Sequence, residues 1–370
     1  MSTPLYFLLI VYCSAIGIQT LYFFLFAVTF SRKRVQRESR SLPISVIVCA
    51  HDEEENLNEL IPLLLAQLHP SFEIIIVNDR SNDNTFDMLL AEASKDHRLR
   101  MVHVNRTPPH VDNKKYALTL GIKAARYEWI LLTDADCRPV SPLWLSEMSK
   151  GFSDNTDFVL GYSPYLLKPG LLNILIRFEA MLTGIQYISF ASMGMPYMGV
   201  GRNLAYRRSK FLEVKGFNNI LHVRGGDDDL YVNEYSNANN TTVCIEESAQ
   251  VNSIPKQSWS DYFNQKVRHL SVGKRYRIGH RLVLGLFMVT WIVAWLSALV
   301  VVFSPVNYAL VGGLFVLRML ALIILYVVAS KKLGQKFEWW TIPLLDFIYA
   351  FYYLVTGLRA LVTKKVKWKN

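Results

Sequence analysis

The chain has 370 residues, a formal net charge of +10, 51% hydrophobic residues and 13% aromatic residues. This hydrophobic share excludes a disordered chain, and 19 Gly with 14 Pro exclude a collagen-like or low-complexity one. The four Cys are far apart and lack metal-ligand spacing, so neither a disulfide scaffold nor a cysteine metal site is expected. The length allows two ordinary domains, or one large domain with membrane segments.

The first apolar segment runs from Leu5 to Phe30 without a charged residue and is long enough to cross a bilayer. It is followed by a basic segment at residues 31–40. By the positive-inside rule this basic side faces the cytoplasm, and the N-terminus lies outside. We therefore expect an N-terminal transmembrane helix over residues 1–30.

Residues 42–165 alternate between short β-branched runs and helical patterns. Strands are expected at residues 44–49, 73–77, 100–104 and 129–133, and helices at 54–68, 84–95 and 114–125. This alternation predicts an α/β fold, with a mostly parallel sheet and helices on both faces. The apolar stretch 171–190 fits either an interfacial helix or a buried core helix.

Polar residues cluster directly after the expected strands, and Asp134 and Asp136 follow the fourth one. Ligands of open α/β sheets bind beyond the carboxyl ends of the strands. Residues i and i+2 of an extended chain point the same way, so these two carboxylates repel unless a cation lies between them. Oxygen ligands suit Mg²⁺ or Mn²⁺. The alternative is a simple turn, and Asp79 or Asp83 could likewise only cap a helix.

The C-terminal region is uncharged from Leu282 to Leu317, which predicts spans near 282–303 and 308–329 with basic, cytoplasmic flanks. A third membrane segment, 339–362, either crosses the bilayer or lies at its surface.

One arginine of the second span, Arg318, falls in the middle of the apolar run, where a charge is costly unless it is paired. Asp346 of the third segment would lie at a similar depth in an antiparallel neighbour. We therefore consider an ion pair between these two residues, with a snorkelling or groove-lining Arg318 as the alternative.

The positive charge lies in four segments beside the apolar stretches, at residues 31–40, 264–281, 331–338 and 364–369. The rest of the chain is net acidic. This distribution favours contact with anionic membrane lipid and argues against nucleic-acid binding.

The ordered motifs of the chain resemble those of membrane-associated family 2 glycosyltransferases. The resemblance extends from about residue 44 to 273 and rests on the segments 45–54, 76–85, 113–119, 133–136, 199–207, 226–230 and 265–269. The segment Thr133-Asp134-Ala135-Asp136 resembles the family's DxD element. Two departures are that Gly226 stands where an acidic residue is usual and His269 where a Trp is usual. The second departure weakens any expectation of processive polymer synthesis.

The resemblance implies a GT-A (Rossmann-like) domain over residues 42–275, between the N-terminal helix and a membrane region at 281–364. It implies an inverting enzyme that moves a sugar from a nucleotide-sugar donor, a UDP-sugar by expectation, to a lipid-linked or glycan acceptor. The enzyme would be an integral membrane protein with its catalytic domain in the cytoplasm, at a bacterial inner membrane.

The resemblance also implies roles for individual residues. The metal, Mg²⁺ or Mn²⁺, would be held by Asp136 and Asp134, and the catalytic base would be Asp227 or Asp228. The residues expected to bind the nucleotide-sugar are Ala50, Asp52, Glu54, Asp79, Lys114, Lys115, Asp134, Gln265 and Arg268. The residues expected on the acceptor side are Gly201, Arg202 and Asn203.

Two other functions are considered. A nucleotidyltransferase would need a Gly-rich basic loop after the first strand, whereas residues 51–55 are acidic. A catalytically degenerate membrane scaffold, or a subunit of a polysaccharide assembly system, would not need Asp79, Asp134, Asp136 and Asp227 together.

Overall fold

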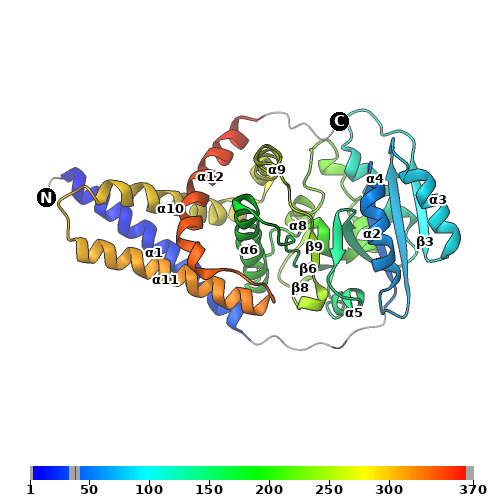
Figure 1. The fold of residues 1–370 in the computed structure, drawn as a ribbon, viewed down its shortest axis with the longest axis horizontal. Helices are drawn as coiled ribbons and strands as arrows, with labels where there is room; N and C mark the ends of the chain where they lie inside the picture. The colour runs from blue at the N-terminus through cyan, green and yellow to red at the C-terminus, as the bar shows by residue number, and fades with distance from the viewer. Residues whose placement is uncertain (1–2, 33–37, 39–41, 364–370) are drawn as a thin grey trace. The chain divides into compact units, whose positions relative to one another are not determined.

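The computed structural model describes residues 3–32, 38 and 42–363 (Figure 1). By its internal contacts the described chain divides into two compact units. A helical unit takes the described residues up to Arg32 and from Tyr262 onward, and a sheet unit takes those from residue 38 to Asp261. Residues 262–275, which the sequence grouped with the domain 42–275, thus belong to the helical unit. The basic residues expected at 33–37 and 364–369 lie outside the described residues.

The sheet unit is built on seven strands in the order β3-β2-β1-β4-β7-β6-β8. Their bounds are β1 (Ile44–Ala50), β2 (Phe72–Asp79), β3 (Leu99–Val104), β4 (Trp129–Asp134), β6 (Phe158–Gly161), β7 (Leu204–Arg207) and β8 (Thr241–Cys244). The first four strands are parallel, β7 is antiparallel to both of its neighbours, and β8 is parallel to β6. The expected mostly parallel sheet is confirmed.

Helices cover both faces of this sheet, as expected. Val46 and Ile74 lie in one core cluster with the leucines of α2, on one face. On the other face, Ile47 and Val77 meet Gly121 of α4, where an added Cβ would lie 2.8 Å from a methyl carbon of each. Only a residue without a side chain lets α4 approach the strands this closely. The bounds of these helices are α2 (Glu54–Leu65), α3 (Thr85–Lys95) and α4 (Asn113–Ala124).

The remaining elements of the sheet unit are short except for one long helix, α6. Of its most apolar 18-residue stretch, 67% is buried. Tyr187 of this helix donates a hydrogen bond to the Gly161 carbonyl of β6. This fits the buried core helix and not the interfacial one. The other elements are β5 (Cys137–Pro139), α5 (Trp144–Ser149), α6 (Leu171–Ser192), η1 (Gly201–Asn203), α7 (Arg208–Glu213), η2 (Asn218–Ile220), α8 (Asp229–Tyr235), η3 (Glu247–Ala249) and β9 (Val251–Ser253).

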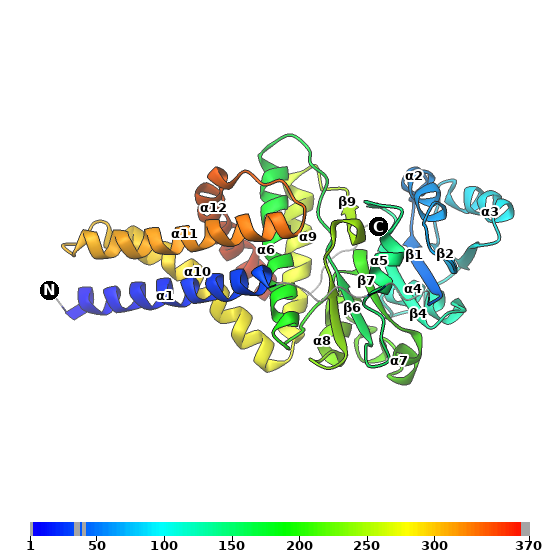
Figure 2. The ribbon, with the colours of Figure 1, turned by 90° about the horizontal axis from the view of Figure 1, so that it is seen from below.

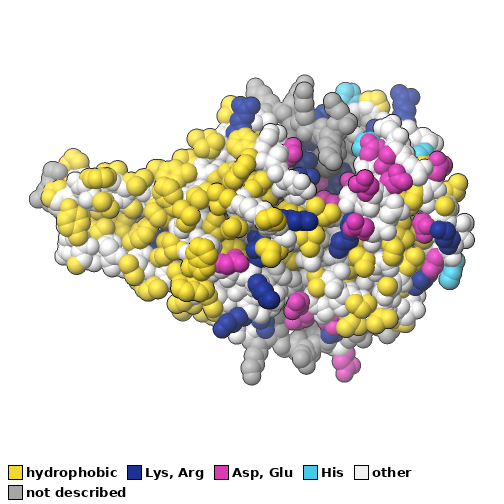
Figure 3. Space-filling view, in the orientation of Figure 1, with side chains coloured by type: hydrophobic (Ala, Val, Ile, Leu, Met, Phe, Trp, Pro, Cys, Tyr) yellow, Lys and Arg dark blue, Asp and Glu magenta, His cyan; other side chains and the backbone are white. Residues whose placement is uncertain are grey.

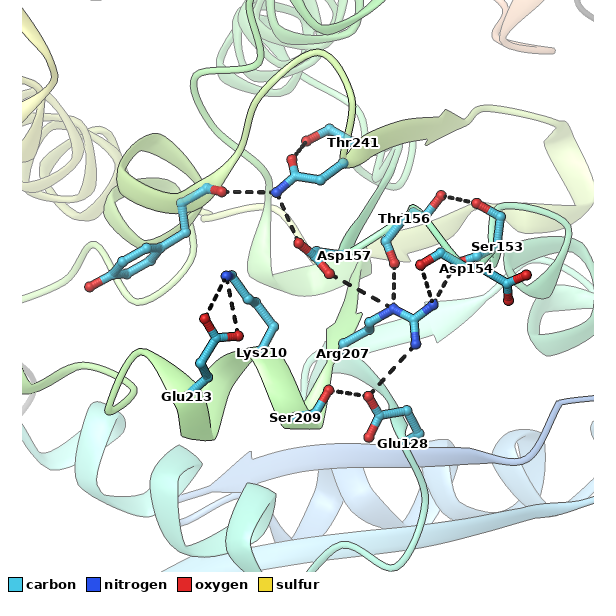
Figure 4. Close-up of polar contacts among 12 residues, drawn as sticks. Glu128, Ser153, Asp154, Thr156, Asp157, Arg207, Ser209, Lys210, Glu213 and Thr241 are labelled. Atoms are coloured by element: carbon cyan, nitrogen blue, oxygen red, sulfur yellow. Dashed lines mark hydrogen bonds and ion pairs between the residues drawn. The ribbon is translucent and has the colours of Figure 1, made fainter.

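A network of polar contacts fixes the end of β7 that pairs with the start of β4 (Figure 4). Arg207 Nε donates to the Thr156 carbonyl at 2.7 Å, and its Nη1 lies 3.8 Å from Glu128 Oε1. The guanidinium also lies 4.9 Å above the centre of the Trp129 ring. These contacts lie at the opposite end of β4 from Asp134, so they hold the sheet without occupying its carboxyl edge.

The helical unit contains four long helices, of which α1 packs along both α10 and α11 (Figures 1 and 2). Figure 3 shows hydrophobic side chains over much of the visible surface of these helices. Among the described residues, five helices are long and apolar enough to cross a membrane: α1, α6, α10, α11 and the segment 339–362. The bounds in this unit are α1 (Thr3–Ser31), α9 (Trp259–Val272), η4 (Gly273–Arg275), α10 (Ile278–Val301), α11 (Tyr308–Lys332), η5 (Trp339–Thr341) and α12 (Ile342–Val362).

A buried ion pair joins three of these helices. Arg318 of α11 donates to both carboxylate oxygens of Asp346 in α12, at 2.7 and 3.0 Å, and both side chains are fully buried. Trp295 of α10 donates its indole N–H to the same carboxylate at 2.9 Å. The expected pairing of Arg318 with Asp346 is confirmed, and the snorkelling alternative is excluded because the guanidinium has no exposure.

Breaking this pair from one side should destabilise the protein strongly, because it leaves one charge buried without its partner. We expect Arg318→Met to cost about 3–5 kcal/mol in unfolding free energy, and Arg318→Met with Asp346→Leu to recover most of that loss. Thermal unfolding in detergent measures both. As a matched control, Lys210→Gln removes an exposed pair with Glu213 and should cost at most about 1 kcal/mol. A double variant at least as unstable as Arg318→Met alone would contradict this expectation.

Candidate active site

The carboxyl ends of three neighbouring parallel strands form the base of the site. In the register of the sheet, Cys49 of β1 lies opposite Val77 of β2 and opposite Asp134 of β4. The next residue of β1, Ala50, lies opposite Asn78. The chain segments that follow these strands therefore begin side by side, as expected for a ligand site of an open α/β sheet.

The acids after β1 hold the turn that follows β2. Asp52, which has a left-handed backbone with φ 54°, accepts a hydrogen bond from the Asn82 backbone N–H at 2.6 Å. Glu54 accepts one from the Asn84 side chain at 2.9 Å. The two carboxylates predicted to bind the nucleotide-sugar thus fix one loop against another, and their role toward a ligand stays a prediction.

At the end of β2, Asp79 has a partner of its own. Arg80 Nε donates to Asp79 Oδ1 at 2.8 Å, and the Asp79 side chain is only 10% exposed. The ring of His51 lies 2.6 Å from the Asp79 carbonyl oxygen. Asp79 is therefore held in one orientation beside the loop that follows β1.

The strongest candidate for a metal site follows β4. Ligand atoms of Asp134, Asp136 and Cys137 lie within 4.8 Å of one another. Burial and the nearby Asp134 charge raise the pKa of Asp136. Burial also holds the pKa of the Cys137 thiol well above its usual range, which leaves the carboxylates as the ready anionic ligands. A divalent cation fits this site, because it would relieve the repulsion between the two carboxylates.

One ammonium, that of Lys114, lies between this pair and a second acidic group. Its Nζ is 3.1 Å from Asp134 Oδ1 and 3.3 Å from Asp227 Oδ2. Burial disfavours the charged ammonium, but the two carboxylates outweigh burial and raise the pKa of Lys114 well above its usual value. Burial would raise the pKa of Asp227, but the charges of Lys114 and Lys115 override it and lower that pKa. Asp227 is thus an ionised carboxylate.

The two candidate bases differ in what their oxygens already bind. Asp228 caps α8 by accepting from the Asp229 backbone N–H at 2.8 Å, and its other oxygen accepts from the Gly201 N–H at 2.7 Å. Burial and the neighbouring Asp227 charge raise the pKa of Asp228. Asp227 Oδ2 is buried and makes no aligned hydrogen bond with any described residue. Asp227 Oδ2 instead faces the Lys114 ammonium at 3.3 Å, whereas both oxygens of Asp228 bind backbone N–H groups.

Two residues predicted to contact substrate, Lys115 and Asn203, form hydrogen bonds with buried backbone carbonyls. The ammonium of Lys115 is fully buried and donates to the carbonyls of Val223 and Gly225, at 2.6 and 2.5 Å, in the loop that leads to Asp227. It therefore supports the loop, and its expected contact with the nucleotide-sugar stays a prediction.

The side chain of Asn203 is also fully buried, which corrects its expected contact with the acceptor. Its amide N–H groups donate to the carbonyls of Tyr162 and Ala249, and its carbonyl accepts from the Trp144 indole at 3.0 Å. All of its polar atoms are used inside the sheet unit.

Two further cations act on the acidic pair. Arg202 has its guanidinium 4.5 Å above the centre of the Tyr165 ring, and its charge acts on Asp134 and Asp136. Lys256, which the sequence reasoning missed, acts on Asp136 as well. Only the pairing of the three-residue strands β5 and β9 brings Lys256 there, so no local sequence signal could have identified it.

The remaining predicted residues, Gln265 and Arg268, lie on α9 in the helical unit. Their assignment to the nucleotide-sugar site stays a prediction from the resemblance.

The buried contacts of Lys115 lead to a stability prediction. Lys115→Met should cost about 2–3 kcal/mol, because two buried carbonyls lose a charged donor. Lys123→Met in the exposed last turn of the same helix is the matched control and should cost less than about 0.5 kcal/mol. Denaturant unfolding measures the loss, and hydrogen exchange should show faster opening of residues 221–227. Equal stability of the two variants would refute the anchoring task of Lys115.

Comparison with solved structures supports the fold. The structure resembles that of the mannosyltransferase PcManGT from Pyrobaculum calidifontis in complex with GDP-Man and Mn²⁺, with a TM-score of 0.59. The similarity covers 97% of this chain and 99% of that one, at 12% sequence identity, so it concerns the fold alone.

Comparison with curated proteins finds partial relatives. The chain is 35% identical over 119 residues to the poly-beta-1,6-N-acetyl-D-glucosamine synthase of Staphylococcus epidermidis, which is 31% of this chain and 27% of that protein. It is 32% identical over 118 residues to the putative glycosyltransferase EpsH of Bacillus subtilis, which is 32% of each protein. The match thus spans about a third or less of either relative.

Two family models match the chain in overlapping regions. The model described as Glycosyl transferase family 2 matches residues 45–211, which contain β1 to β4 and the DxD element. The model described as Glycosyl transferase family group 2 matches residues 129–355, from β4 into α12. Because the second match covers more than half of the chain and includes both units, the protein belongs to glycosyl transferase family group 2.

Proposed function

We propose that this protein is an inverting glycosyltransferase that moves a sugar from a UDP-sugar to a lipid-linked or glycan acceptor. One observation carries the proposal: a single ammonium, Lys114, is within 3.3 Å of both Asp134 and Asp227. A carboxylate pair suited to a metal and an ionised carboxylate suited to take a proton are therefore neighbours. Transfer to a hydroxyl acceptor needs these two groups on one substrate.

The metal site in this proposal consists of Asp136 and Asp134, with Mg²⁺ or Mn²⁺ as the ion. The ion would neutralise negative charge on the departing nucleoside diphosphate. Lys114 contributes a positive charge beside Asp134, where its ammonium can move to a diphosphate oxygen. Asp79, at the end of β2, is proposed to bind the nucleotide base.

Asp227 is proposed as the general base, because its Oδ2 faces the Lys114 ammonium at 3.3 Å and both oxygens of Asp228 already bind backbone N–H groups. It would accept the proton of an acceptor hydroxyl while the hydroxyl oxygen attacks the anomeric carbon. The bond from that carbon to the diphosphate oxygen breaks, and the nucleoside diphosphate leaves. A single attack from the face opposite the leaving group inverts the configuration at the anomeric carbon.

The donor sugar is proposed from the relatives. The Staphylococcus epidermidis relative is named for a polymer of N-acetyl-D-glucosamine, and the fold neighbour binds GDP-Man with Mn²⁺. We propose UDP-N-acetylhexosamine as the first donor to test, with UDP-hexoses and GDP-mannose beside it.

Donor turnover tests the proposal directly. Detergent-purified protein with Mn²⁺ or Mg²⁺ should release nucleotide slowly from one of these donors, and a chelator should stop the release. Asp136→Asn and Asp227→Asn should each lower the rate by about 10²-fold or more. Asp87→Asn, an exposed acid on α3, is the matched control and should keep the rate.

Binding of the donors is measured in parallel by thermal shift, because a strict enzyme hydrolyses little without its acceptor. Absence of both binding and turnover for every donor, with either metal, would reject the proposed activity and favour a degenerate scaffold. Full activity of Asp227→Asn would reject only the role of Asp227.

We further propose that the catalytic unit faces the cytoplasm, because basic residues flank the apolar spans. They are Lys266, Lys274, Arg275 and Arg277 before α10, Arg281 in its first turn, Lys331 and Lys332 in the last turn of α11, and Lys336 after it. This gives the order N-terminal helix, cytoplasmic glycosyltransferase domain and C-terminal membrane region.

Fusions to alkaline phosphatase, which is active only outside the cytoplasm, test this orientation. A fusion after Pro305, between α10 and α11, should be active, and one after Lys336 should be inactive. The reverse pattern would refute the cytoplasmic placement.

A further inference from the structure

Arg202 carries a charge that no described residue neutralises by direct contact. Its guanidinium lies 4.5 Å above the centre of the Tyr165 ring, and its Nη1 is buried without a hydrogen-bond partner among the described residues. Such a group costs free energy unless a ligand takes its hydrogen bonds. Lys114 differs from Arg202 in this respect, because it has two carboxylates within 3.3 Å that balance its charge.

The chain beside Arg202 presents apolar side chains to solvent. Tyr165 begins a loop that leads into α6. Leu167 in this loop is 70% exposed, and Leu171, the first residue of α6, is 51% exposed. The buried side chain of Asn173 fixes the backbone on both sides of Leu167, because it donates to the Leu166 carbonyl and accepts from the Lys168 N–H. Two exposed leucines therefore follow Tyr165, the residue whose ring the Arg202 guanidinium covers.

Backbone pairing fixes this loop beside the acidic pair. The Leu166 N–H donates to the Ser253 carbonyl of β9, and the Ile254 N–H donates to the Asp136 carbonyl. Lys256 follows two residues later and adds a second positive charge near Asp136. Among the described residues, Lys256 makes no hydrogen bond or ion pair of its own.

On the basis of the proposed transferase function, we propose that Arg202, with Lys256, binds the phosphate of a lipid phosphate acceptor while Leu167 and Leu171 contact its hydrocarbon chain. A guanidinium makes paired hydrogen bonds to phosphate oxygens. Phosphate and hydrocarbon are adjacent in a lipid phosphate. Here the Arg202 guanidinium lies over the ring of Tyr165, and the exposed leucines follow Tyr165 in the chain. A nucleotide-sugar has no hydrocarbon chain, so the leucines distinguish acceptor from donor.

The backbone also connects this subsite to the proposed base. The N–H of Gly201, next to Arg202, donates to Asp228 Oδ2, and Asp228 follows Asp227 in the chain. A phosphate on Arg202 would therefore lie close to Asp227. In such an acceptor a phosphate oxygen attacks the anomeric carbon, and Asp227 would take the one proton that a monoprotonated phosphate still carries.

Binding of three probes to the full chain in detergent tests the inference: citronellyl phosphate, citronellol and inorganic phosphate. Wild type should bind citronellyl phosphate at least about tenfold more tightly than either of the others, because only it has both parts. Arg202→Gln should weaken citronellyl phosphate about tenfold, and Arg202→Lys should restore part of the loss. Arg126→Gln, an arginine before β4 with a 62% exposed side chain, is the matched control.

The apolar half is tested separately by Leu167→Ser with Leu171→Ser. This variant should weaken citronellyl phosphate several-fold and leave inorganic phosphate unchanged. UDP binding with Mn²⁺ should stay within about twofold of wild type in this variant and in Arg202→Gln.

Three results would overturn the inference. One is equal affinity of wild type for citronellyl phosphate and citronellol. Another is weaker UDP binding in Arg202→Gln with unchanged citronellyl phosphate binding, which would place Arg202 at the donor. The third is unchanged binding in the leucine variant, which also decides the matter if Arg202→Gln does not fold. Failure of donor turnover alone would reject the transferase, because the lipid phosphate measurements need no donor.

Discussion

The site depends on two consecutive lysines at the start of α4, which point in directions about 100° apart because a helix has 3.6 residues per turn. Lys114 reaches the carboxylates of Asp134 and Asp227, and Lys115 holds the loop that carries Asp227. Asp112 caps the helix in front of them and donates its N–H to the carbonyl of Leu221. One helix start thus fixes the distance between the end of β4 and the start of α8.

Strands β1, β2 and β4 of the parallel half were predictable because each is buried on both faces and reads as a nearly continuous apolar run. The predicted helix 54–68 ends at Leu65, because Leu68 turns away and donates its N–H to the Pro142 carbonyl. The antiparallel half was not predictable. Strands β6, β7 and β8 have four residues each, and contacts far apart in the sequence, such as that of Arg207 with Thr156, hold them. A local pattern carries no information about such partners.

The same limit applies to the site. Position after a strand identified Asp134 and Asp136, because topology alone brings strand ends together. Motif position could not show which way a side chain points: Lys115 and Asn203 lie within motifs, yet their polar atoms bind buried backbone and the Trp144 indole. The motif left both Asp227 and Asp228 as candidate bases. Hydrogen bonds favour Asp227, since the carboxylate of Asp228 already binds two backbone N–H groups.

Two arginines of this chain show how the partners of a buried charge indicate its task. Arg318 is fully buried and donates to both carboxylate oxygens of Asp346. The indole N–H of Trp295 donates to the same carboxylate. Its charge is satisfied within the fold, and no ligand is needed to explain it. Arg202 has an aromatic ring on one side and no hydrogen-bond acceptor among the described residues. Since folded proteins pair nearly all of their buried polar groups, an arginine left in this state beside a metal-type carboxylate pair is best explained by an anion that arrives from outside.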